Sequence, residues 1–291
     1  MSYTVVVVLH DSAAELAGLL RSFDARLSEQ PQVVVVDTGR DDGGARAAAA
    51  WGAEVIERRD NPGFGAACNA GVSAAHADVT VLLNPDCELL DDALPRLAAI
   101  AAGARGSLHA PRLLDAGGVQ RSAHPLPGTA GALLAAPLPP ALLPHRARER
   151  LEPWRSGRAV SVGWAIGACL AADTAALLRL GPFDPAVHLF AEDMDLCLRA
   201  RALGMPTVLH PELALRHAGG HATHRAGEPY DLLARRRRAV VGATRGRRAR
   251  ALDDAAQAIT FASRAAGHAL LGGDAGRPLR QLQALSRAVR G

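Results

Sequence analysis

Three carboxylates lie within four positions of the chain, at Glu192, Asp193 and Asp195, directly before an apolar helical pattern. Like charges this close repel one another unless a cation, a substrate proton or a helix start stabilises them. Carboxylates held at such a point can act as a general base or bind a metal ion. The alternative is an acidic first turn that only caps a helix, because such turns are common.

Acidic residues also follow strand-like runs in the first hundred residues. These β-branched or apolar runs are 3–9, 32–36, 53–57 and 79–83. They alternate with helical patterns, which predicts an open parallel sheet with helices on both faces. The acids just past the strand ends are Asp11, Asp37, Asp60 and Asp86. Because ligands bind at that edge of such sheets, the repeated acids favour a binding site there.

The remaining elements are less regular. Ser12 and Glu15 predict a capping box at the first helix. Asp173 is expected to cap a short helix that ends near residue 181, and two short strands are expected at 207–210 and 213–217. Residues 119–158 are rich in Pro and Arg without a clear period, which indicates a surface excursion, either a lid or an acceptor loop.

Charge and composition restrict the class of protein. Residues 1–234 hold 20 Arg against 26 acids, whereas residues 235–291 hold 13 Arg against 3 acids. The acidic body suits cation binding and the basic tail suits an anionic surface. The four cysteines have no CxxC spacing, so a zinc site or disulfide framework is not expected. We expect no signal peptide and no transmembrane helix, hence a cytoplasmic location, with attachment to the inner face of the plasma membrane left open.

Several short motifs follow one another along the chain, and their order is informative. They are Val-Val-Val-Val-Asp at 33–37, Asn-Pro-Gly-Phe-Gly-Ala-Ala-Cys-Asn at 61–69, Leu-Leu-Asn-Pro-Asp at 82–86, Gly-Ala at 167–168, Gly-Pro-Phe-Asp at 181–184, the acidic segment 190–199, and His-Ala-Gly-Gly-His at 217–221. This set resembles inverting family 2 glycosyltransferases of the GT-A fold, most closely their rhamnosyltransferase-like members. The resemblance implies an α/β domain with a mixed sheet at 1–228, then a basic helical extension at 229–291.

The resemblance also implies a donor site. Asp37 matches the acid that hydrogen-bonds the nucleotide base, although it could instead cap the turn that follows. Gly63 and Gly65 would let the backbone approach the nucleotide sugar, although an ordinary turn into a helix also explains them. The nucleotide-sugar-binding residues expected are Leu9, Asp11, Asp37, Asn61, Gly63, Gly65, Asn69, Asn84 and Asp86.

A divalent metal is the expected cofactor, either Mg²⁺ or Mn²⁺. Asp86 matches the second acid of the family's Asp-x-Asp motif, whereas Asn84 replaces the first and removes one charge. An Asn carbonyl can still bind a cation, directly or through water; the alternative is an Asn-Pro turn. His217 matches a histidine that ligates the metal or the diphosphate, although a structural His is common. His221 and His224 follow it and could contact the diphosphate.

In the resemblance, Asp193 is the base that takes the proton of the acceptor hydroxyl, and Glu192 assists or orients it. One base opposite the leaving diphosphate gives a single in-line displacement with inversion. Asp195 is expected to cap the helix or to pair with Arg199.

The acceptor side is less well defined. Trp164 and Gly167 line the acceptor pocket in the resemblance, although a core Trp is an equal alternative. The Arg-rich tail predicts an amphipathic helix that either binds an anionic membrane surface or packs on the catalytic domain. Nucleic acid is not expected as a partner, since no aromatic residues interleave with the arginines.

The sequence therefore predicts an inverting transferase that moves a hexose or deoxyhexose to an acceptor hydroxyl, with dTDP-L-rhamnose as the favoured donor. The acceptor would be a polysaccharide or glycolipid precursor, polyprenyl-linked or not, or a small natural product. A sugar-1-phosphate nucleotidyltransferase is one alternative, but residues 9–12 lack its Gly-rich basic loop. A non-catalytic nucleotide-sugar-binding protein of the same fold is another, and Asn84 is its only support.

Overall fold

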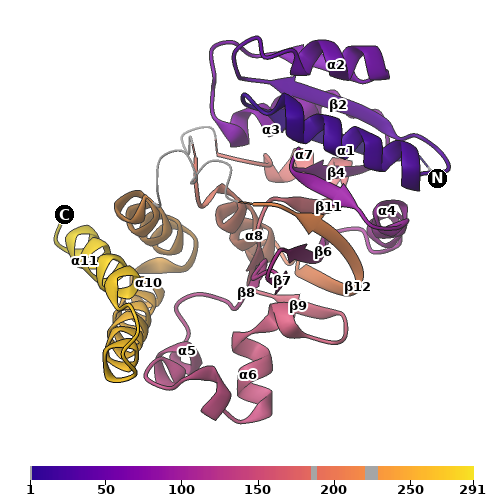
Figure 1. Cartoon of the computed structure of the whole chain (residues 1–291). Helices are drawn as coiled ribbons and strands as arrows, with labels where there is room; N and C mark the ends of the chain where they lie inside the picture. The colour runs from indigo at the N-terminus through magenta and orange to yellow at the C-terminus, as the bar shows by residue number, and fades with distance from the viewer. Residues whose placement is uncertain (1, 185–188, 220–228) are drawn as a thin grey trace. The chain divides into compact units, whose positions relative to one another are not determined.

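The computed structural model describes residues 2–184, 189–219 and 229–291 (Figure 1). It divides into two compact units, Met1–Ala123 with Trp154–Gly219, and His124–Pro153 with Gly220–Gly291. This division differs from the expected boundary at residue 228, because residues 124–153 belong to the second unit. His221 and His224 lie outside the described residues. All the predicted donor, catalytic and metal residues lie in the first unit.

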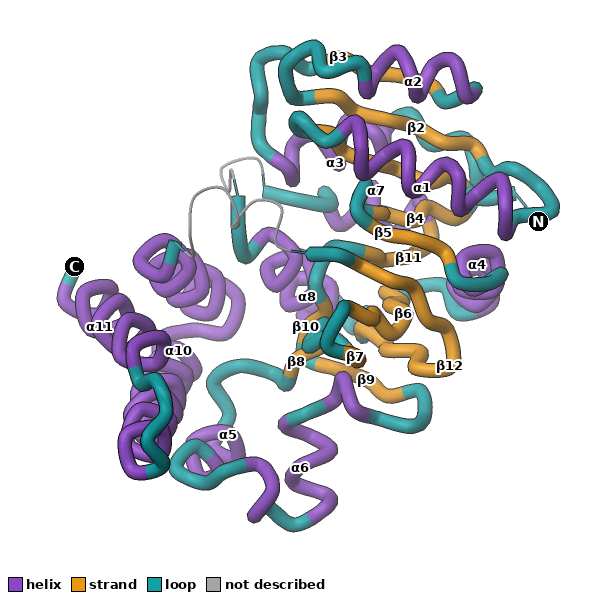
Figure 2. The backbone as a smooth tube through the Cα atoms, viewed as in Figure 1, coloured by secondary structure: helices purple, strands orange, loops and turns teal. Residues whose placement is uncertain are grey.

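A mixed sheet forms the centre of the first unit (Figure 2). Its strand order is β3 (Glu54–Glu57), β2 (Gln32–Asp37), β1 (Thr4–Leu9), β4 (Val79–Leu83), β11 (Cys169–Asp173), β6 (Leu108–Asp115), β12 (Thr207–His217) and β5 (Cys87–Leu89). Strands β1 to β4 are parallel, β11 is antiparallel to β4, and β5 is antiparallel to β12. The short strands are β7 (Gly118–Val119), β8 (Ala123–His124), β9 (Val160–Val162) and β10 (Trp164–Ala165). The predicted mixed α/β fold is therefore confirmed.

Helices cover both faces of this sheet. They are α1 (Ala13–Arg26), α2 (Gly44–Trp51), α3 (Phe64–Ser73), α4 (Ala93–Gly103), α7 (Thr174–Leu180) and α8 (Glu192–Ala202). In β1, Val5 and Val7 enter the core with α1 and α4, whereas Val6 and Val8 enter the core with α3, α7 and α8. Alternate side chains of a strand point to opposite faces, so burial of both faces explains the continuous β-branched run.

Three local predictions have mixed outcomes. The capping box is wrong: Ser12 Oγ accepts a hydrogen bond from the His10 amide (3.2 Å), and the Ala13 amide donates to Asp42 Oδ2 (3.0 Å). The cap at Asp173 is confirmed, since its Oδ1 accepts the Ala176 amide at 2.9 Å. The two strands expected after residue 206 form one strand, β12, whose pairing with β6 is irregular after His210.

The second unit is helical, as expected for the tail. It contains α5 (Ala130–Ala135), α6 (His145–Leu151), α10 (Tyr230–Leu270) and α11 (Gly276–Arg290), with a 3₁₀ turn at Pro140–Leu142; a second 3₁₀ turn, Pro153–Arg155, lies at the boundary between the two units. Gly246 breaks α10 with a φ of 83°, and Arg237 pairs with Asp253 across the break at 2.8 Å. Helices α10 and α11 pack on each other. Among the described residues, no helix has the length and apolar character of a transmembrane span.

Candidate active site

Asp193 lies in the first turn of α8, behind an unusual backbone segment. Phe190 and Ala191 adopt left-handed conformations with φ of 70° and 68°. Such backbone is costly for residues other than Gly and tends to occur at functional sites. The half-buried Asp193 carboxylate accepts the Gly167 amide at 3.1 Å and the Met194 amide at 2.7 Å. The segment therefore fixes this carboxylate in one orientation.

The protonation of Asp193 suits a base. Burial raises the pKa of its carboxyl group to about 6, although the amides of Met194 and Gly167 act in the opposite direction. A raised pKa makes a carboxylate a stronger proton acceptor, provided that the pH is high enough to ionise it. At neutral pH Asp193 can accept a proton.

The segment before β11 connects Asp193 to the Asn-Pro-Asp turn. The Gly167 backbone amide donates to the Asp193 carboxylate, and the carbonyl of the next residue, Ala168, accepts the backbone amide of Asn84 at 2.9 Å. Consecutive residues are only about 3.8 Å apart between Cα atoms. The structure therefore brings together two of the sequence-predicted groups that lie more than a hundred positions apart.

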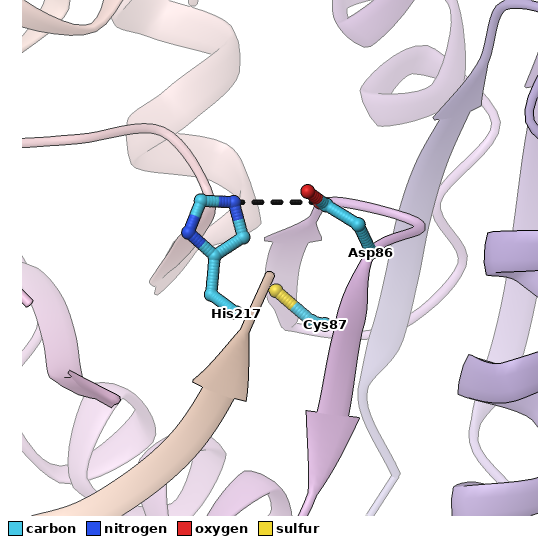
Figure 3. A group of neighbouring side chains, drawn as sticks. All are labelled: Asp86, Cys87 and His217. Carbon is cyan, nitrogen blue, oxygen red and sulfur yellow. Dashed lines mark ion pairs between the residues drawn. The ribbon is translucent and has the colours of Figure 1, made fainter. Parts of the chain in front are cut away.

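Asp86 and His217 form the second half of the site (Figure 3). Antiparallel pairing of β5 with β12 places His217 opposite Cys87, and the imidazole Nε2 lies 3.4 Å from Asp86 Oδ1. The Gly219 amide donates to Asp86 Oδ2 at 3.0 Å. Burial opposes ionisation of Asp86, whereas His217 in its protonated form and the Gly219 amide favour it, and the net effect is a lowered pKa of this carboxyl group.

These residues fit a divalent cation. Two ligand atoms that share one ion at about 2.1 Å typically lie about 3 to 3.5 Å apart, which the Asp86–His217 distance satisfies. Asn84 Oδ1 is buried and accepts no hydrogen bond from the residues described. Burial raises the pKa of the Cys87 thiol, and its Sγ donates to the Ala168 carbonyl, so Cys87 is a poor ligand.

Asp37 lies at the end of β2 and is almost fully buried. Its Oδ1 accepts the Gly39 amide at 3.0 Å, which is the turn contact considered as the alternative. Its Oδ2 accepts the Arg59 guanidinium at 2.9 Å. Carboxylate oxygens can accept further hydrogen bonds, so these contacts are compatible with base recognition.

Leu9 and Asp11 lie at the neighbouring end of β1. The Leu9 side chain is buried in the core, and its carbonyl accepts the Thr38 amide and hydroxyl. Asp11 has a left-handed φ of 51° and pairs with Arg40 at 2.9 Å; the Arg40 amide and guanidinium lower the pKa of Asp11. Both residues therefore lie at the expected sheet edge, with Leu9 offering only backbone.

The 61–69 segment is used largely for packing. Asn61 is exposed with a φ of 42°, and Gly63 precedes α3 with a φ of 92°. A Cβ on Gly65 would lie 2.8 Å from the Phe183 Cβ, so close helix packing already explains this glycine without a ligand. The Asn69 amide holds the same residue, through bonds of 2.8 and 2.9 Å to the Phe183 backbone.

Trp164, which was expected to line the acceptor pocket, is half-buried and packs on the core with α3, α7 and α8. This contact is the core role considered for it. The predicted Asp195–Arg199 pair is confirmed at 2.7 Å. Arg199 also donates to the carbonyls of Leu180 and Pro182, so it holds the connection from α7 towards α8.

Comparison with known proteins identifies the family. The sequence model of the family described as "Glycosyl transferase family 2" matches residues 4–124. The chain is also 30% identical, over 246 residues, to an N-acetylglucosaminyl-diphospho-decaprenol L-rhamnosyltransferase of Mycobacterium tuberculosis. That alignment covers 76% of this chain and 77% of the relative. The chain belongs to glycosyltransferase family 2.

Solved glycosyltransferases share the fold of this family 2 enzyme. GalNAc-T7, solved with UDP, GalNAc and Mn²⁺, has a TM-score of 0.60 at 16% identity; the match covers 83% of this chain but only 47% of GalNAc-T7. The mannosyltransferase PcManGT of Pyrobaculum calidifontis, solved with GDP-Man and Mn²⁺, has a TM-score of 0.55 at 16% identity. The match covers 99% of this chain and 73% of PcManGT. The GT-A expectation is thus confirmed, and the nucleotidyltransferase and non-catalytic alternatives lose their support.

The sequence motifs did not predict two residues that contact the candidate site of this glycosyltransferase. Arg59 neutralises Asp37 but belongs to no motif; its only signal is a basic residue two positions beyond β3. The Oε1 atom of Gln120 lies 2.9 Å from His217 Nδ1. The sequence pattern predicts only an irregular surface excursion from residue 119 onward. The signal for Gln120 is the Asp-Ala-Gly-Gly turn at 115–118, which predicts a hairpin directly before it.

Proposed function

We propose that this glycosyltransferase transfers L-rhamnose from dTDP-L-rhamnose, with inversion, to a hydroxyl of a polyprenyl-diphosphate-linked sugar. The observation that carries the transfer chemistry is the fixed Asp193 carboxylate, joined by Gly167 and Ala168 to the turn at Asn84. The donor sugar and the acceptor class rest on the mycobacterial relative, whose name states a rhamnosyl transfer to a decaprenol-linked sugar.

In this proposal, Asp193 accepts the proton of the acceptor hydroxyl as its oxygen attacks the anomeric carbon. The bond to the diphosphate breaks in the same in-line step, so the anomeric configuration inverts. Glu192, buried beside Asp193 at the start of α8, helps to orient the acid and the acceptor. The helix N-terminus favours the ionised form of Asp193 before the proton arrives.

Asp86, His217 and Asn84 would hold the divalent cation. Such a cation, when bound, offsets the charge of the donor diphosphate and of the departing nucleotide. The carboxylate is already oriented by the Gly219 amide, and His217 presents Nε2 towards it. Asp37 would accept the N3–H of the thymine base, with Arg59 neutralising its charge.

Nucleotide binding gives a direct test of the donor class. Because a ligand that binds only the folded state raises stability, dTDP with Mn²⁺ at 100 times its Kd should raise Tm by about 5 to 10 °C. UDP and GDP at the same concentration as dTDP are the comparison ligands, and each is tested with and without the metal. Equal shifts for all three nucleotides would contradict recognition of thymine, and shifts unchanged by Mn²⁺ or Mg²⁺ would contradict a cation at Asp86.

The pH dependence of transfer should follow Asp193. Its pKa is raised to about 6, so below this pH the base is protonated and kcat/KM should fall about tenfold per pH unit. Above it the profile should level off. The measurement is kcat/KM between pH 4.5 and 8 at saturating metal, with circular dichroism to show that the fold persists. A profile that stays flat from pH 5 to 7 would contradict the assignment.

The basic helices of the second unit are proposed to hold the enzyme at an anionic membrane, where a polyprenyl-linked acceptor resides. Leu270 and Leu271, at the turn between α10 and α11, are 86% and 88% exposed. Arg280 and Arg290 on α11 are also exposed. Exposed apolar side chains next to a helix with exposed arginines suit insertion between anionic headgroups.

Vesicle binding tests this surface. Each basic residue near an anionic bilayer contributes about 1 kcal/mol, so removing two with R280Q and R290Q together should weaken binding to phosphatidylglycerol vesicles about 30-fold. The matched control removes two exposed arginines of α1 with R21Q and R26Q. Equal losses in both pairs, or equal binding to neutral phosphatidylcholine vesicles, would argue against the proposed surface.

A further inference from the structure

Gln120 is held in place by a hairpin that the motif reading did not identify. Strand β6 turns back into β7, with Asp115 opposite Gly118 and Leu114 opposite Val119. Directly after β7, the Gln120 amide donates to the Leu113 carbonyl at 2.8 Å, and the Ser122 amide donates to the Gln120 carbonyl at 2.8 Å. The backbone of Gln120 is therefore fixed on both sides.

The side chain of Gln120 meets the ring of His217. Its Oε1 lies 2.9 Å from Nδ1 of the imidazole. A carbonyl oxygen only accepts hydrogen bonds, so this contact requires Nδ1 to carry the hydrogen. A neutral imidazole has one N–H, and Nε2 is then left with its lone pair.

That lone pair faces the carboxylate of Asp86. Nε2 of His217 lies 3.4 Å from Asp86 Oδ1, and the turn that carries Asp86 also holds the buried Oδ1 of Asn84, which has no hydrogen-bond partner among the described residues. The Asn84 amide nitrogen is 3.5 Å from Nε2 and can donate only a weak bond. Imidazole nitrogen, carboxylate oxygen and amide oxygen atoms all carry lone pairs, and such atoms are the ligands of a divalent cation.

We propose that Gln120 is a positioning residue: it holds His217 in the Nδ1–H tautomer, so that the Nε2 lone pair is a ligand for the cation at Asp86. This inference rests on the cation site of the proposed function. Histidine ligands commonly donate their other N–H to a carbonyl or carboxylate, which fixes the ring and its tautomer. A neutral amide does this without adding charge next to Asp86.

Gly219 completes the arrangement. Its amide holds Asp86 Oδ2, and its φ is +66°. A Cβ on Gly219 would lie 3.0 Å from Gln120 Nε2, so a larger residue would press on the amide. The same short segment thus orients the carboxylate and leaves room for the group that orients the imidazole.

The first measurement is the tautomer of His217 in the metal-free protein. Nitrogen-15 NMR of histidine-labelled protein separates the two tautomers, and the signals of His217 are assigned as those that disappear in H217Q. We expect Nδ1–H in the wild type and in Q120E, where a carboxylate oxygen replaces the amide oxygen, and a mixture of tautomers in Q120L. The Nε2–H tautomer in the wild type would overturn the proposal, whatever the metal does.

The second measurement is Mn²⁺ binding by electron paramagnetic resonance in the presence of dTDP. Loss of an outer-sphere partner typically weakens metal binding about 10- to 100-fold, so Q120L should show that loss and Q120E should not. Q30L, an exposed glutamine of the first unit, is the control. A tautomer change in Q120L with unaltered Mn²⁺ affinity would overturn the role of Gln120. A wild type without Mn²⁺ binding would overturn the cation site itself, which the metal-free spectrum does not test.

Discussion

Substitution of Asp193 by Asn is expected to lower kcat for sugar transfer by about 10²- to 10⁴-fold, the usual contribution of a general base. The amide keeps the size of the carboxylate and its oxygen can still accept the Gly167 amide, but it cannot accept the proton of the acceptor hydroxyl. Donor binding should persist, because the proposed nucleotide contacts at Asp37 and Asp86 are unaltered. Initial rates with labelled donor, together with Kd for dTDP, measure the two effects separately.

The matched control for this prediction is D78N. Asp78 is an acid of the same unit whose side chain is 80% exposed and forms a surface ion pair with Arg105. Surface pairs of this kind contribute little to stability, so D78N should retain wild-type rates. Wild-type kcat in D193N would remove Asp193 as the base. A parallel loss of dTDP affinity would show instead that the donor site had been disturbed.

Opposite substitutions in the Asn-Pro-Asp turn should change metal dependence in opposite directions. D86N removes the only carboxylate among the three proposed ligands, so we expect Mn²⁺ affinity to fall more than about tenfold and transfer to fall with it. N84D adds a second carboxylate at a buried oxygen that has no hydrogen-bond partner among the described residues. It should tighten Mg²⁺ and Mn²⁺ binding, because affinity for hard cations rises with ligand charge.

Titration of both variants with Mg²⁺ and Mn²⁺, followed by activity at each metal concentration, measures these changes. C87S is the control at the neighbouring position, since the Cys87 thiol stays protonated and should contribute no ligand. Equal metal dependence in wild type, D86N and N84D would contradict a cation at this turn. A loss of activity in N84D through overtight binding of product should be recovered at lower metal concentration.

The first hundred residues were predictable because their pattern is local. Strands buried on both faces give unbroken β-branched runs, and β4 coincides with the predicted strand 79–83. Where a distant group intervenes, the local reading fails. Asp42, 30 positions after Ser12, supplies the contact to the Ala13 amide and replaces the predicted capping box. Residues 207–210 and 213–217 were likewise predicted as two strands, whereas β12 is one strand with an irregular pairing to β6.

The site divides in the same way. Asp86, Asp193 and His217 carry chemically distinctive groups in ordered motifs, so the sequence could name them before their distances were known. Arg59 and Gln120 have no distinctive spacing, and each acts through another residue. Their importance follows from contacts across 22 and 97 positions, which periodicity does not reveal.

Inverting rhamnosyl transfer determines the anomeric configuration of the product, which can be measured. The enzyme would be incubated with dTDP-L-rhamnose, Mn²⁺ and a short-chain polyprenyl-diphosphate N-acetylglucosamine, and the new linkage characterised by NMR. We expect a rhamnoside whose anomeric configuration is opposite to that of the donor. A product that retains the donor configuration would contradict Asp193 as the base of a single displacement. Transfer of another sugar in preference to rhamnose would contradict the proposed donor.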